Sequence, residues 1–415
     1  MRDVRMKGFA TRADVEDVER FLVDHTQVCK PEAVELSECV GRVLAEDVRA
    51  AVNVPGFNRS AMDGYAVRGE ESFGASSYNP IRFEIIGESM PGHPFEGDLA
   101  PGAAVRIMTG APVPTGADAV VMAEVCNEVA NQVEVSEAIA PQKNVGQVGE
   151  DICEGEIVLR AGRRLRPQDA GLLSSIGVGR PRCVRRPRVR LVVTGNELLP
   201  AGSLPGGSKI VDSNSVVLRG LLERDGAELL PFEILPDDPE PIARAMADPL
   251  ADVVLVSGGS SVGKEDFAPN LLREMGSLDF HGISMRPSSP SGVGRIEGRL
   301  VFLLPGNPVS CLCAYEFFAG PSLRAMGGRS RAWPHRRVRL PLARKITSKI
   351  GRTDYVRVAE EEGKIVPLAT SGASILSSTV RAIGVVIVSR EREGAAPGDE
   401  VEVLLYDDEP WELSP

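Results

Sequence analysis

Three stretches in the second half of the chain share one pattern: Leu191-Val-Val-Thr-Gly-Asn-Glu197, Val253-Val-Leu-Val-Ser-Gly-Gly-Ser-Ser-Val-Gly263 and Val301-Phe-Leu-Leu-Pro-Gly-Asn-Pro-Val-Ser310. Each is a short apolar run that ends in a polar loop containing glycine. Such runs indicate strands that are buried on both faces of a parallel sheet. Ligands of these sheets bind beyond the carboxyl ends of the strands, where glycine lets backbone N–H groups turn towards an anion. The three stretches therefore predict one polar, anion-binding pocket, as is typical of an enzyme.

The length and the patterning predict several domains. A chain of 415 residues is too long for one ordinary hydrophobic core. Strands alternate with helices around the three stretches, which predicts a doubly wound parallel α/β sheet. Short strands broken by glycine and proline predict β modules elsewhere. We expect a discontinuous N-terminal domain (1–52 and 154–186), an inserted β module (53–153), a central α/β domain (187–328) and a small, β-barrel-like C-terminal domain (329–415).

Several helices are expected from periodicity and capping signals. Apolar side chains recur at helical spacing over residues 13–27, and residues 34–47 are expected to form a second short helix. A helix that opens at Pro167 should end near Gly177, by the usual placement of proline and glycine at helix ends. In the α/β domain, a helix that is capped near Ser213 and ends at Gly226 is expected.

The composition excludes some classes of function. The formal net charge of -11 argues against a dominant nucleic-acid or anionic-membrane role. Six arginines over residues 180–190 have no interleaved aromatic side chains, so we interpret them as a solvated domain junction. The 7 cysteines contain no Cys-x-x-Cys pair, which favours a reducing compartment. With no apolar segment that could span a bilayer, we expect a cytoplasmic protein without membrane or nucleic-acid partners.

Four acidic residues follow the predicted strands. Glu197, Asp237, Asp238 and Asp266 stand beside glycine-rich backbone. Carboxylates next to an anion-binding loop suit a Mg²⁺ ion that bridges them to phosphate oxygens. Alternatively, Asp237 and Asp238 cap a helix ahead of Pro239, and Asp266 caps the next helix. The residues alone leave both interpretations open.

Six ordered motifs, spread over essentially the whole chain, resemble those of the MoeA/gephyrin family of molybdopterin molybdotransferases. They are Ser60-Ala-Met-Asp-Gly-Tyr-Ala-Val67, Arg106-Ile-Met-Thr-Gly-Ala-Pro-Val-Pro114, Thr194-Gly-Asn-Glu-Leu198, Asp237-Asp-Pro239, Ser257-Gly-Gly-Ser-Ser-Val-Gly263 and Leu304-Pro-Gly-Asn-Pro-Val-Ser310. The resemblance implies insertion of molybdate into the dithiolene of adenylyl-molybdopterin with release of AMP, the last step of molybdenum cofactor biosynthesis. It also implies Mg²⁺ as cofactor, a homodimer of four-domain subunits with contacts through the N-terminal domain, and other proteins of this pathway as partners.

The resemblance further assigns roles to individual residues. The catalytic residues would be Asp63, Thr109 and Asp151 from one subunit and Glu197, Asp237 and Asp266 from the other, the last three also being the metal ligands. The substrate-binding residues would be Gly195, Ser257, Gly258, Gly259, Ser261, Gly263, Pro305, Gly306, Asn307, Pro308 and Ser310. The oxyanion-binding residues would be Arg286, Ser289, Ser310, Arg352, Ser377 and Ser378.

One segment departs from the family pattern. The chain has Met285-Arg-Pro-Ser-Ser-Pro290 where the family usually has Lys-Pro-Gly-Lys-Pro. Arg286 keeps the charge of the first lysine with another geometry, whereas Ser289 lacks the charge of the second. This loss is expected to weaken oxyanion binding by about 1–3 kcal/mol, unless Arg59 replaces the charge from across the dimer.

Three alternatives to a molybdate transferase therefore stay open. One is a non-catalytic molybdopterin-binding carrier, which the altered segment over residues 285–290 motivates. Another is a tungstate-preferring paralogue, because the two oxyanions differ too little for a sequence to separate. The third is an adenylyltransferase like the single-domain relatives, which the additional N-terminal and C-terminal modules disfavour.

Overall fold

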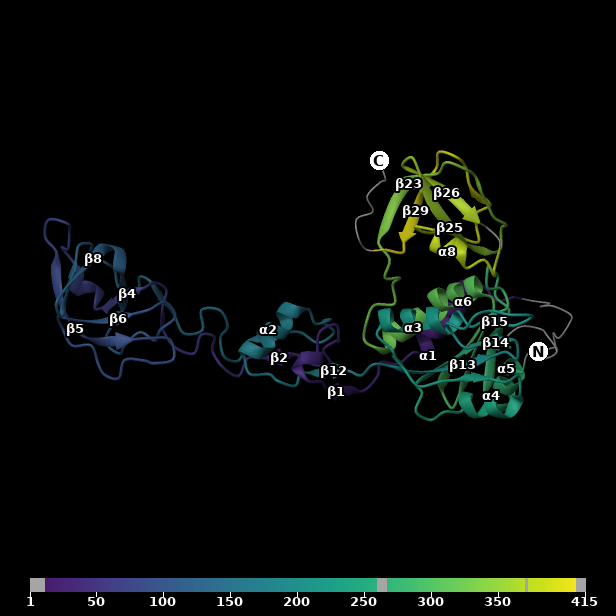
Figure 1. Ribbon diagram of the computed structural model, residues 1–415, viewed down its shortest axis with the longest axis horizontal. Helices are drawn as coiled ribbons and strands as arrows, with labels where there is room; N and C mark the ends of the chain where they lie inside the picture. Colours follow the sequence, from purple (N-terminus) through teal and green to yellow (C-terminus); the bar gives the residue numbers. More distant parts are fainter. Residues whose placement is uncertain (1–11, 260–266, 370–371, 408–415) are drawn as a thin grey trace. The chain divides into compact units, whose positions relative to one another are not determined.

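The computed structural model describes residues 12–259, 267–369 and 372–407. The chain divides into two compact units, one formed by Ala33–Cys183 and the other by the chain on either side, Met1–Glu32 and Val184–Pro415 (Figure 1). The boundary between the units falls inside the arginine-rich run over 180–190, which confirms its interpretation as a junction. Five of these arginines lie near carboxylates: Arg180 near Glu35, Arg182 near Glu46, Arg185 near Asp252, Arg188 near Glu228 and Arg190 near Asp248.

The larger unit contains a seven-stranded sheet with the order β16-β13-β18-β22-β21-β19, in which β17 also pairs with β13. The predicted strands β13, β18 and β22 are neighbours and parallel, as expected. The sheet is nevertheless mixed, because β21 and β19 pair in the antiparallel sense at one edge. Its strands are β13 (Arg188–Thr194), β16 (Glu228–Leu229), β17 (Ile234–Leu235), β18 (Val253–Ser257), β19 (Ser277–His281), β21 (Gly292–Ile296) and β22 (Arg299–Leu304).

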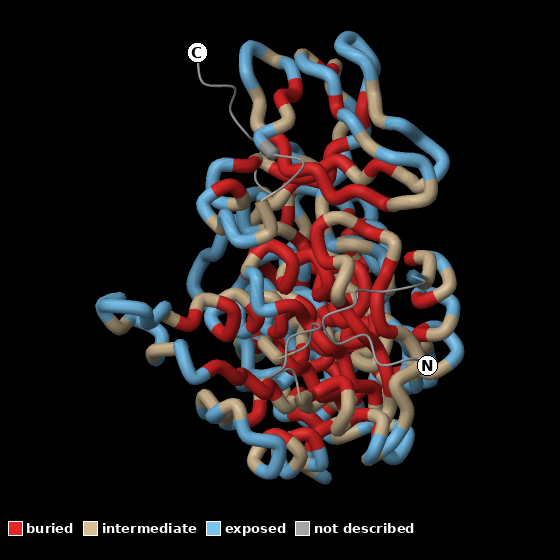
Figure 2. The backbone as a smooth tube through the Cα atoms, turned by 90° about the vertical axis from the view of Figure 1, so that its right-hand side faces the viewer, coloured by how far each residue is buried: buried red, intermediate tan, exposed pale blue. Residues whose placement is uncertain are grey.

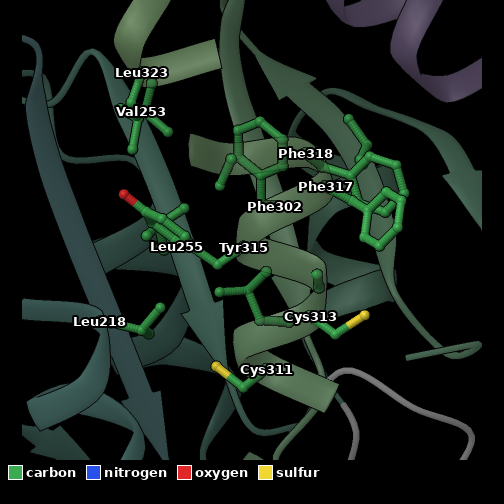
Figure 3. Close-up of a cluster of buried hydrophobic side chains, with 14 of the residues drawn as sticks. Leu218, Val253, Leu255, Phe302, Cys311, Cys313, Tyr315, Phe317, Phe318 and Leu323 are labelled. Carbon is green, nitrogen blue, oxygen red and sulfur yellow. The ribbon is translucent and has the colours of Figure 1, made fainter. Parts of the chain in front are cut away.

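Both faces of this sheet are covered, so the doubly wound prediction is confirmed. Alternate residues of β18 point to opposite cores: Val253 and Leu255 belong to one cluster, Val254 and Val256 to the other. Figure 3 shows part of the first cluster, to which Leu218 and Phe302 belong together with Val253 and Leu255. The helices of the first face are α1 (Val15–His25), α3 (Asn214–Asp225), α6 (Pro308–Ala314), the π-helical turn η4 (Tyr315–Ala319) and α7 (Gly320–Met326), and those of the second are α4 (Pro239–Met246) and α5 (Ala268–Met275).

The ends of these helices follow from local sequence. Helix α3 begins after Ser213 and ends at Gly226, whose φ of 77° is left-handed and suits glycine. The Asp238 carboxylate accepts a hydrogen bond from the Glu240 N–H at 3.0 Å and so caps α4. Asp238 is therefore the capping residue of this pair of acids, which leaves Asp237 for another role.

The C-terminal part of the same unit is built on a second sheet with the order β20-β25-β27-β29-β23, and β26 pairs with β25. Strand β20 comes from the chain segment of the α/β domain, and it places Met285 opposite Thr353 and Arg286 opposite Asp354. Figure 2 shows buried positions running through the centre of this unit, with exposed loops around them. The elements are β20 (Met285–Arg286), β23 (Arg337–Pro341), β24 (Ile346–Thr347), β25 (Thr353–Glu361), β26 (Lys364–Ala369), α8 (Ser377–Val380), β27 (Gly384–Val388), β28 (Gly394–Ala395) and β29 (Glu400–Leu405).

The smaller unit contains a six-stranded sheet with the order β7-β4-β6-β5-β9-β8. Helix α2 (Pro167–Ser175) lies where the sequence predicts it. The strands of the sheet are β4 (Gly64–Val67), β5 (Ile81–Ser89), β6 (Ala103–Ile107), β7 (Ala119–Met122), β8 (Cys126–Val129) and β9 (Gln132–Val135). Shorter elements are β2 (Val48–Arg49), η2 (Gly69–Ser72), η3 (Ala123–Val125), β11 (Ile157–Leu159) and the pair β3 (Arg59–Ser60) and β10 (Val145–Gly146). The paired strands β1 (Pro31–Ala33) and β12 (Arg182–Val184) contain the two chain boundaries of this unit.

One helix prediction is wrong. Residues 34–47 contain only the 3₁₀ turn η1 (Leu36–Glu38), followed by turns and isolated bridges. Val43 pairs with Arg164 and Leu44 with Cys183, so the backbone N–H and C=O groups of this segment are bonded to distant parts of the chain rather than within a helix.

Among the described residues, no helix combines the length and the apolar character needed to cross a membrane.

Candidate functional site

A pocket of about 600 Å³ lies beyond the carboxyl ends of β13, β18 and β22. This is the position that the three glycine-bearing stretches predict. The pocket brings together nine of the predicted site residues: Gly195, Glu197, Asp237, Ser257, Gly258, Gly259, Gly306, Asn307 and Pro308. Ser374, from the C-terminal part of the chain, also lines it. The predicted residues Ser261, Gly263 and Asp266 lie outside the described residues.

Glycine is required where two of these loops meet. Gly258 has a φ of 96°, and a Cβ atom there would lie 2.5 Å from the Thr194 carbonyl oxygen. A Cβ atom on Gly259, with a φ of 56°, would lie 3.1 Å from Thr194 Oγ1. The loop after β18 therefore packs against the end of β13 so closely that only glycine fits without strain.

Asn214 ties two of the loops together. Its side-chain amide donates hydrogen bonds to Ser257 Oγ at 3.0 Å and to the Gly306 carbonyl at 2.8 Å. Its Oδ1 atom and Thr194 Oγ1 are buried without a hydrogen-bond partner in the described part of the chain. Both residues line the pocket, so a polar ligand could satisfy these atoms. In the sequence, Asn214 is only the first residue of the helix expected near Ser213, and no local pattern marks it as a pocket residue.

The two predicted acids of this domain lie on the same pocket. The Asn196 N–H donates to Asp237 Oδ2 at 2.9 Å, and the Asp237 N–H donates to Asn196 Oδ1 at 3.3 Å. The Glu197 carboxylate folds back over Gly195. Its Oε2 atom lies only 2.9 Å from the position that a Cβ atom on residue 195 would take. The capping alternative thus holds for Asp238 but not for Asp237, whose carboxylate binds the loop after β13.

This donor set fits a hard divalent cation. Mg²⁺ is usually held by one or two carboxylates together with substrate phosphate oxygens and water. Glu197 and Asp237 supply two carboxylates, whereas the third predicted ligand, Asp266, is not among the described residues. No cluster of three or more metal-binding His, Cys, Asp or Glu side chains occurs in the ranges that the structure describes. Phosphate oxygens of a substrate and water could complete the coordination.

The predicted oxyanion residues are only partly brought together. Arg286 and Arg352 share the buried carboxylate of Asp354, with Arg286 Nη2 at 2.5 Å and Arg352 Nε at 2.7 Å. Ser289 Oγ is buried without a hydrogen-bond partner among the described residues.

The other predicted oxyanion and proline residues occupy different places. The Ser378 hydroxyl donates to the Ile375 carbonyl at 2.5 Å, within its own turn. The neighbouring Ser377 begins α8, and its carbonyl accepts a hydrogen bond from Arg381. Ser310 is buried in α6, where its carbonyl accepts a hydrogen bond from Ser288 Oγ at 2.8 Å. Pro305 is buried at the end of β22. Within the described part of the chain, Arg286 and Arg352 are thus the two members of this group that share a partner, Asp354.

In the smaller unit, two of the predicted catalytic residues, Asp63 and Thr109, are hydrogen-bonded to each other. Asp63 Oδ1 accepts hydrogen bonds from the N–H and from the hydroxyl of Thr109, both at 2.7 Å. These bonds lower the pKa of Asp63, because they favour its charged form. Asp151 contacts Val54 through its backbone N–H. Arg59 pairs with Glu150 at 2.8 Å, so its charge is already balanced within this unit.

Comparisons with known proteins match three consecutive parts of the chain to related families. Residues 13–177 match the MoeA N-terminal region (domain I and II), residues 190–325 a "Probable molybdopterin binding domain", and residues 339–406 the MoeA C-terminal region (domain IV). The molybdopterin molybdenumtransferase of Haemophilus influenzae is 32% identical over 383 residues, which cover 90% of this chain and 93% of that protein. Molybdopterin molybdenumtransferase 2 of Mycobacterium tuberculosis is also 32% identical, and the matched residues cover 96% of this chain and 99% of that protein.

Solved structures of MoeA proteins have the same fold as this chain. Two structures of a molybdopterin biosynthesis MoeA protein from Pyrococcus horikoshii have TM-scores of 0.83 and 0.75. They are 31% and 32% identical to this chain, cover 97% and 95% of it, and are themselves covered completely (100%). The predicted fold class is confirmed.

Proposed function

Because this chain belongs to the MoeA family, we propose that it is a molybdopterin molybdenumtransferase, an enzyme of molybdenum cofactor biosynthesis. The observation that carries the proposal is the pocket beyond β13, β18 and β22. There, Glu197 and Asp237 stand beside glycine-rich backbone that can approach phosphate oxygens closely. A carboxylate pair next to such backbone suits a phosphorylated substrate that arrives with a divalent cation.

The reaction that we propose inserts molybdate into the dithiolene of adenylyl-molybdopterin and releases AMP. Two Mo–S bonds form while the two thiol protons and one molybdate oxygen leave as water. Water cleaves the phosphoanhydride bond to AMP, and no electrons are exchanged. The phosphoanhydride carries negative charge that must be neutralised at the reacting phosphorus, which explains the need for acids that hold a cation.

The residues of the pocket would have different roles in this reaction. Glu197 and Asp237 would hold Mg²⁺, which when bound supplies a positive charge to the phosphoanhydride oxygens. The backbone at Gly258 and Gly259 can approach the substrate closely, because no side chain intervenes. Asn214 Oδ1, which is buried without a hydrogen-bond partner among the described residues, offers a directional contact to the bound molecule. These groups orient the substrate before the bond is broken.

We further propose that the working form is a homodimer. Asp63 and Thr109, which are hydrogen-bonded to each other in the smaller unit, would join the pocket of a second subunit together with Asp151. The lowered pKa of Asp63 keeps its carboxylate ionised, as a contact to a metal-bound or cationic group requires.

The direct test is AMP release from adenylyl-molybdopterin with Mg²⁺, measured with and without molybdate. We expect AMP release that depends on Mg²⁺ and is stimulated by molybdate. Tight binding of adenylyl-molybdopterin without AMP release at any molybdate concentration would contradict the transferase and support a carrier. Stimulation by tungstate alone would identify the enzyme as tungstate-preferring. The carrier is the second candidate because Arg286 and Arg352 are already bound to a carboxylate.

The substitution Ser289→Lys should strengthen molybdate binding. Ser289 Oγ is buried without a partner in the described chain, at the position where the family pattern has a lysine. A positive charge there should lower the dissociation constant of molybdate about tenfold, because one added contact to a dianion contributes about 1–3 kcal/mol. Titration calorimetry with molybdate measures the change. Ser289→Met, which has a similar length and no charge, is the control, and equal affinities in the two variants would refute the prediction.

A further inference from the structure

Asp354 is the common partner of Arg286 and Arg352. Its side chain is 1% exposed, and its two oxygens accept hydrogen bonds from Arg352 Nε at 2.7 Å, Arg286 Nη2 at 2.5 Å and Arg352 Nη2 at 3.2 Å. The parallel register of β20 and β25 places Arg286 opposite Asp354. Arg286 also donates to the Thr347 carbonyl at 3.3 Å. Two guanidinium groups, one from the α/β chain segment and one from the C-terminal segment, are thus held on one buried carboxylate.

This carboxylate changes the charge that an oxyanion would meet. Two guanidinium charges against one carboxylate leave one net positive charge for a dianion. Because Asp354 is buried, water screens its repulsion of the dianion only weakly. Unused donors remain on this chain segment, since Arg286 Nε and, three residues further on, Ser289 Oγ are buried without hydrogen-bond partners among the described residues. The geometry therefore offers hydrogen bonds to an oxyanion but opposes it with a fixed negative charge.

We propose that Asp354 limits the affinity of the oxyanion site. Its carboxylate competes with the oxyanion for Arg286 and Arg352, and it keeps anion binding weak enough for molybdate to leave towards the dithiolene. The inference rests on the proposed function, because it takes the two arginines as oxyanion ligands. A purely structural role, in which Asp354 only fastens β20 to β25, would make the same contacts. The two roles differ in their effect on anion affinity: removing the negative charge of Asp354 should tighten anion binding only if Asp354 competes with the anion.

The test is the substitution Asp354→Asn, which replaces the carboxylate by an amide of the same shape. Binding of molybdate and of sulfate is measured by titration calorimetry at low and high salt. We expect both anions to bind about tenfold more tightly at low salt, because a buried like charge has been removed. The Michaelis constant for molybdate should fall, while that for adenylyl-molybdopterin stays the same. Unchanged or weaker anion binding by folded protein would overturn the proposal in favour of the structural role.

A matched control removes a carboxylate from another arginine pair. Asp279 binds Arg295 in a bidentate pair, with Arg295 Nη2 at 3.0 Å, and lies on β19, a strand that carries none of the residues assigned to the site. Asp279→Asn should leave anion binding unchanged. An equal gain in both variants would show a general effect of protein charge and would overturn the role of Asp354.

Two further outcomes are informative. If the unmodified protein binds neither molybdate nor sulfate, the oxyanion site of the proposed function fails and this inference fails with it. If it binds both and Asp354→Asn does not tighten them, only the role of Asp354 is overturned. Should Asp354→Asn not fold, Arg286→Gln replaces it as the test. That variant leaves Arg352 and Asp354 as a neutral pair, so anion affinity should fall at least about tenfold, and retained affinity would overturn the proposal.

Discussion

Asp237→Asn is expected to lower Mg²⁺-dependent AMP release by at least about 100-fold. Asp237 lines the pocket, and its Oδ2 atom accepts the Asn196 N–H at 2.9 Å. Asparagine has the same shape and can still accept this hydrogen bond, so the loop should keep its conformation. The variant loses the negative charge that would hold the cation. Turnover at saturating substrate over a Mg²⁺ titration measures the effect, and thermal unfolding checks that the fold is intact.

The neighbouring residue provides the control for this prediction. Asp238 caps α4 by accepting the Glu240 N–H at 3.0 Å. Asp238→Asn keeps a good capping residue, and Asp238→Ala should cost about 1 kcal/mol of stability while AMP release changes little. An Asp237→Asn enzyme with normal turnover at every Mg²⁺ concentration would exclude Asp237 as a metal ligand. Equal losses of activity in the Asp237 and Asp238 variants would point to the loop conformation instead.

Glu316→Gln is expected to lower the free energy of unfolding by about 3 kcal/mol at neutral pH. Glu316 is 2% exposed within the π-helical turn η4, and Arg224 Nη1 donates to its carboxylate at 2.6 Å. His335 Nε2 lies 3.4 Å from the same carboxylate, and His335 Nδ1 lies 3.0 Å from the Leu405 carbonyl of β29. The network thus links the α/β core to the C-terminal sheet. Neutralising Glu316 would remove one of the two carboxylates that pair with the half-buried Arg224.

The same carboxylate predicts a dependence of stability on pH. Burial alone raises the pKa of Glu316, but hydrogen bonds from His335 and Arg224 outweigh it and lower the pKa from 4.5 to about 2. A lowered pKa in the folded state stabilises the fold above the unfolded pKa, and this stability is lost as the pH falls from 4.5 towards 2. The difference in unfolding free energy between the unmodified protein and Glu316→Gln should therefore shrink over this range.

Urea unfolding at neutral pH and at two acidic pH values measures both effects. Glu228→Gln is the control, because Glu228 is half exposed and lies 3.5 Å from Arg188 at the surface. Such a pair contributes about 0–1 kcal/mol, so its loss should change stability little at any pH. A Glu316→Gln protein as stable as the unmodified one at neutral pH would refute the importance of the network. A difference that stays constant down to the lowest pH would refute the proposed ionisation.

Much of the fold follows from local sequence patterns. The apolar runs that contain Val253–Ser257 and Arg299–Leu304 alternate between two cores, because neighbouring residues of a strand point to opposite faces. Helix α3 begins and ends where its capping signals, Ser213 and Gly226, predict. The position of the pocket also follows, since parallel strands align their carboxyl ends at one edge of the sheet. Signals of this kind act within a few residues and can be read without knowing the neighbours in space.

Contacts between distant residues could not be predicted in this way. Residues 34–47 have helical spacing, yet bridges to Arg164 and Cys183 compete with a helix and prevail. Two adjacent aspartates, Asp237 and Asp238, have the same side chain, and only the nearby Asn196 loop directs the first into the pocket. Asp354 looks like any polar residue of a strand until the register with β20 brings Arg286 to it. Such roles depend on which segments meet after the chain has folded, because hydrogen bonds and charges act over a few ångströms of space regardless of their separation in the sequence.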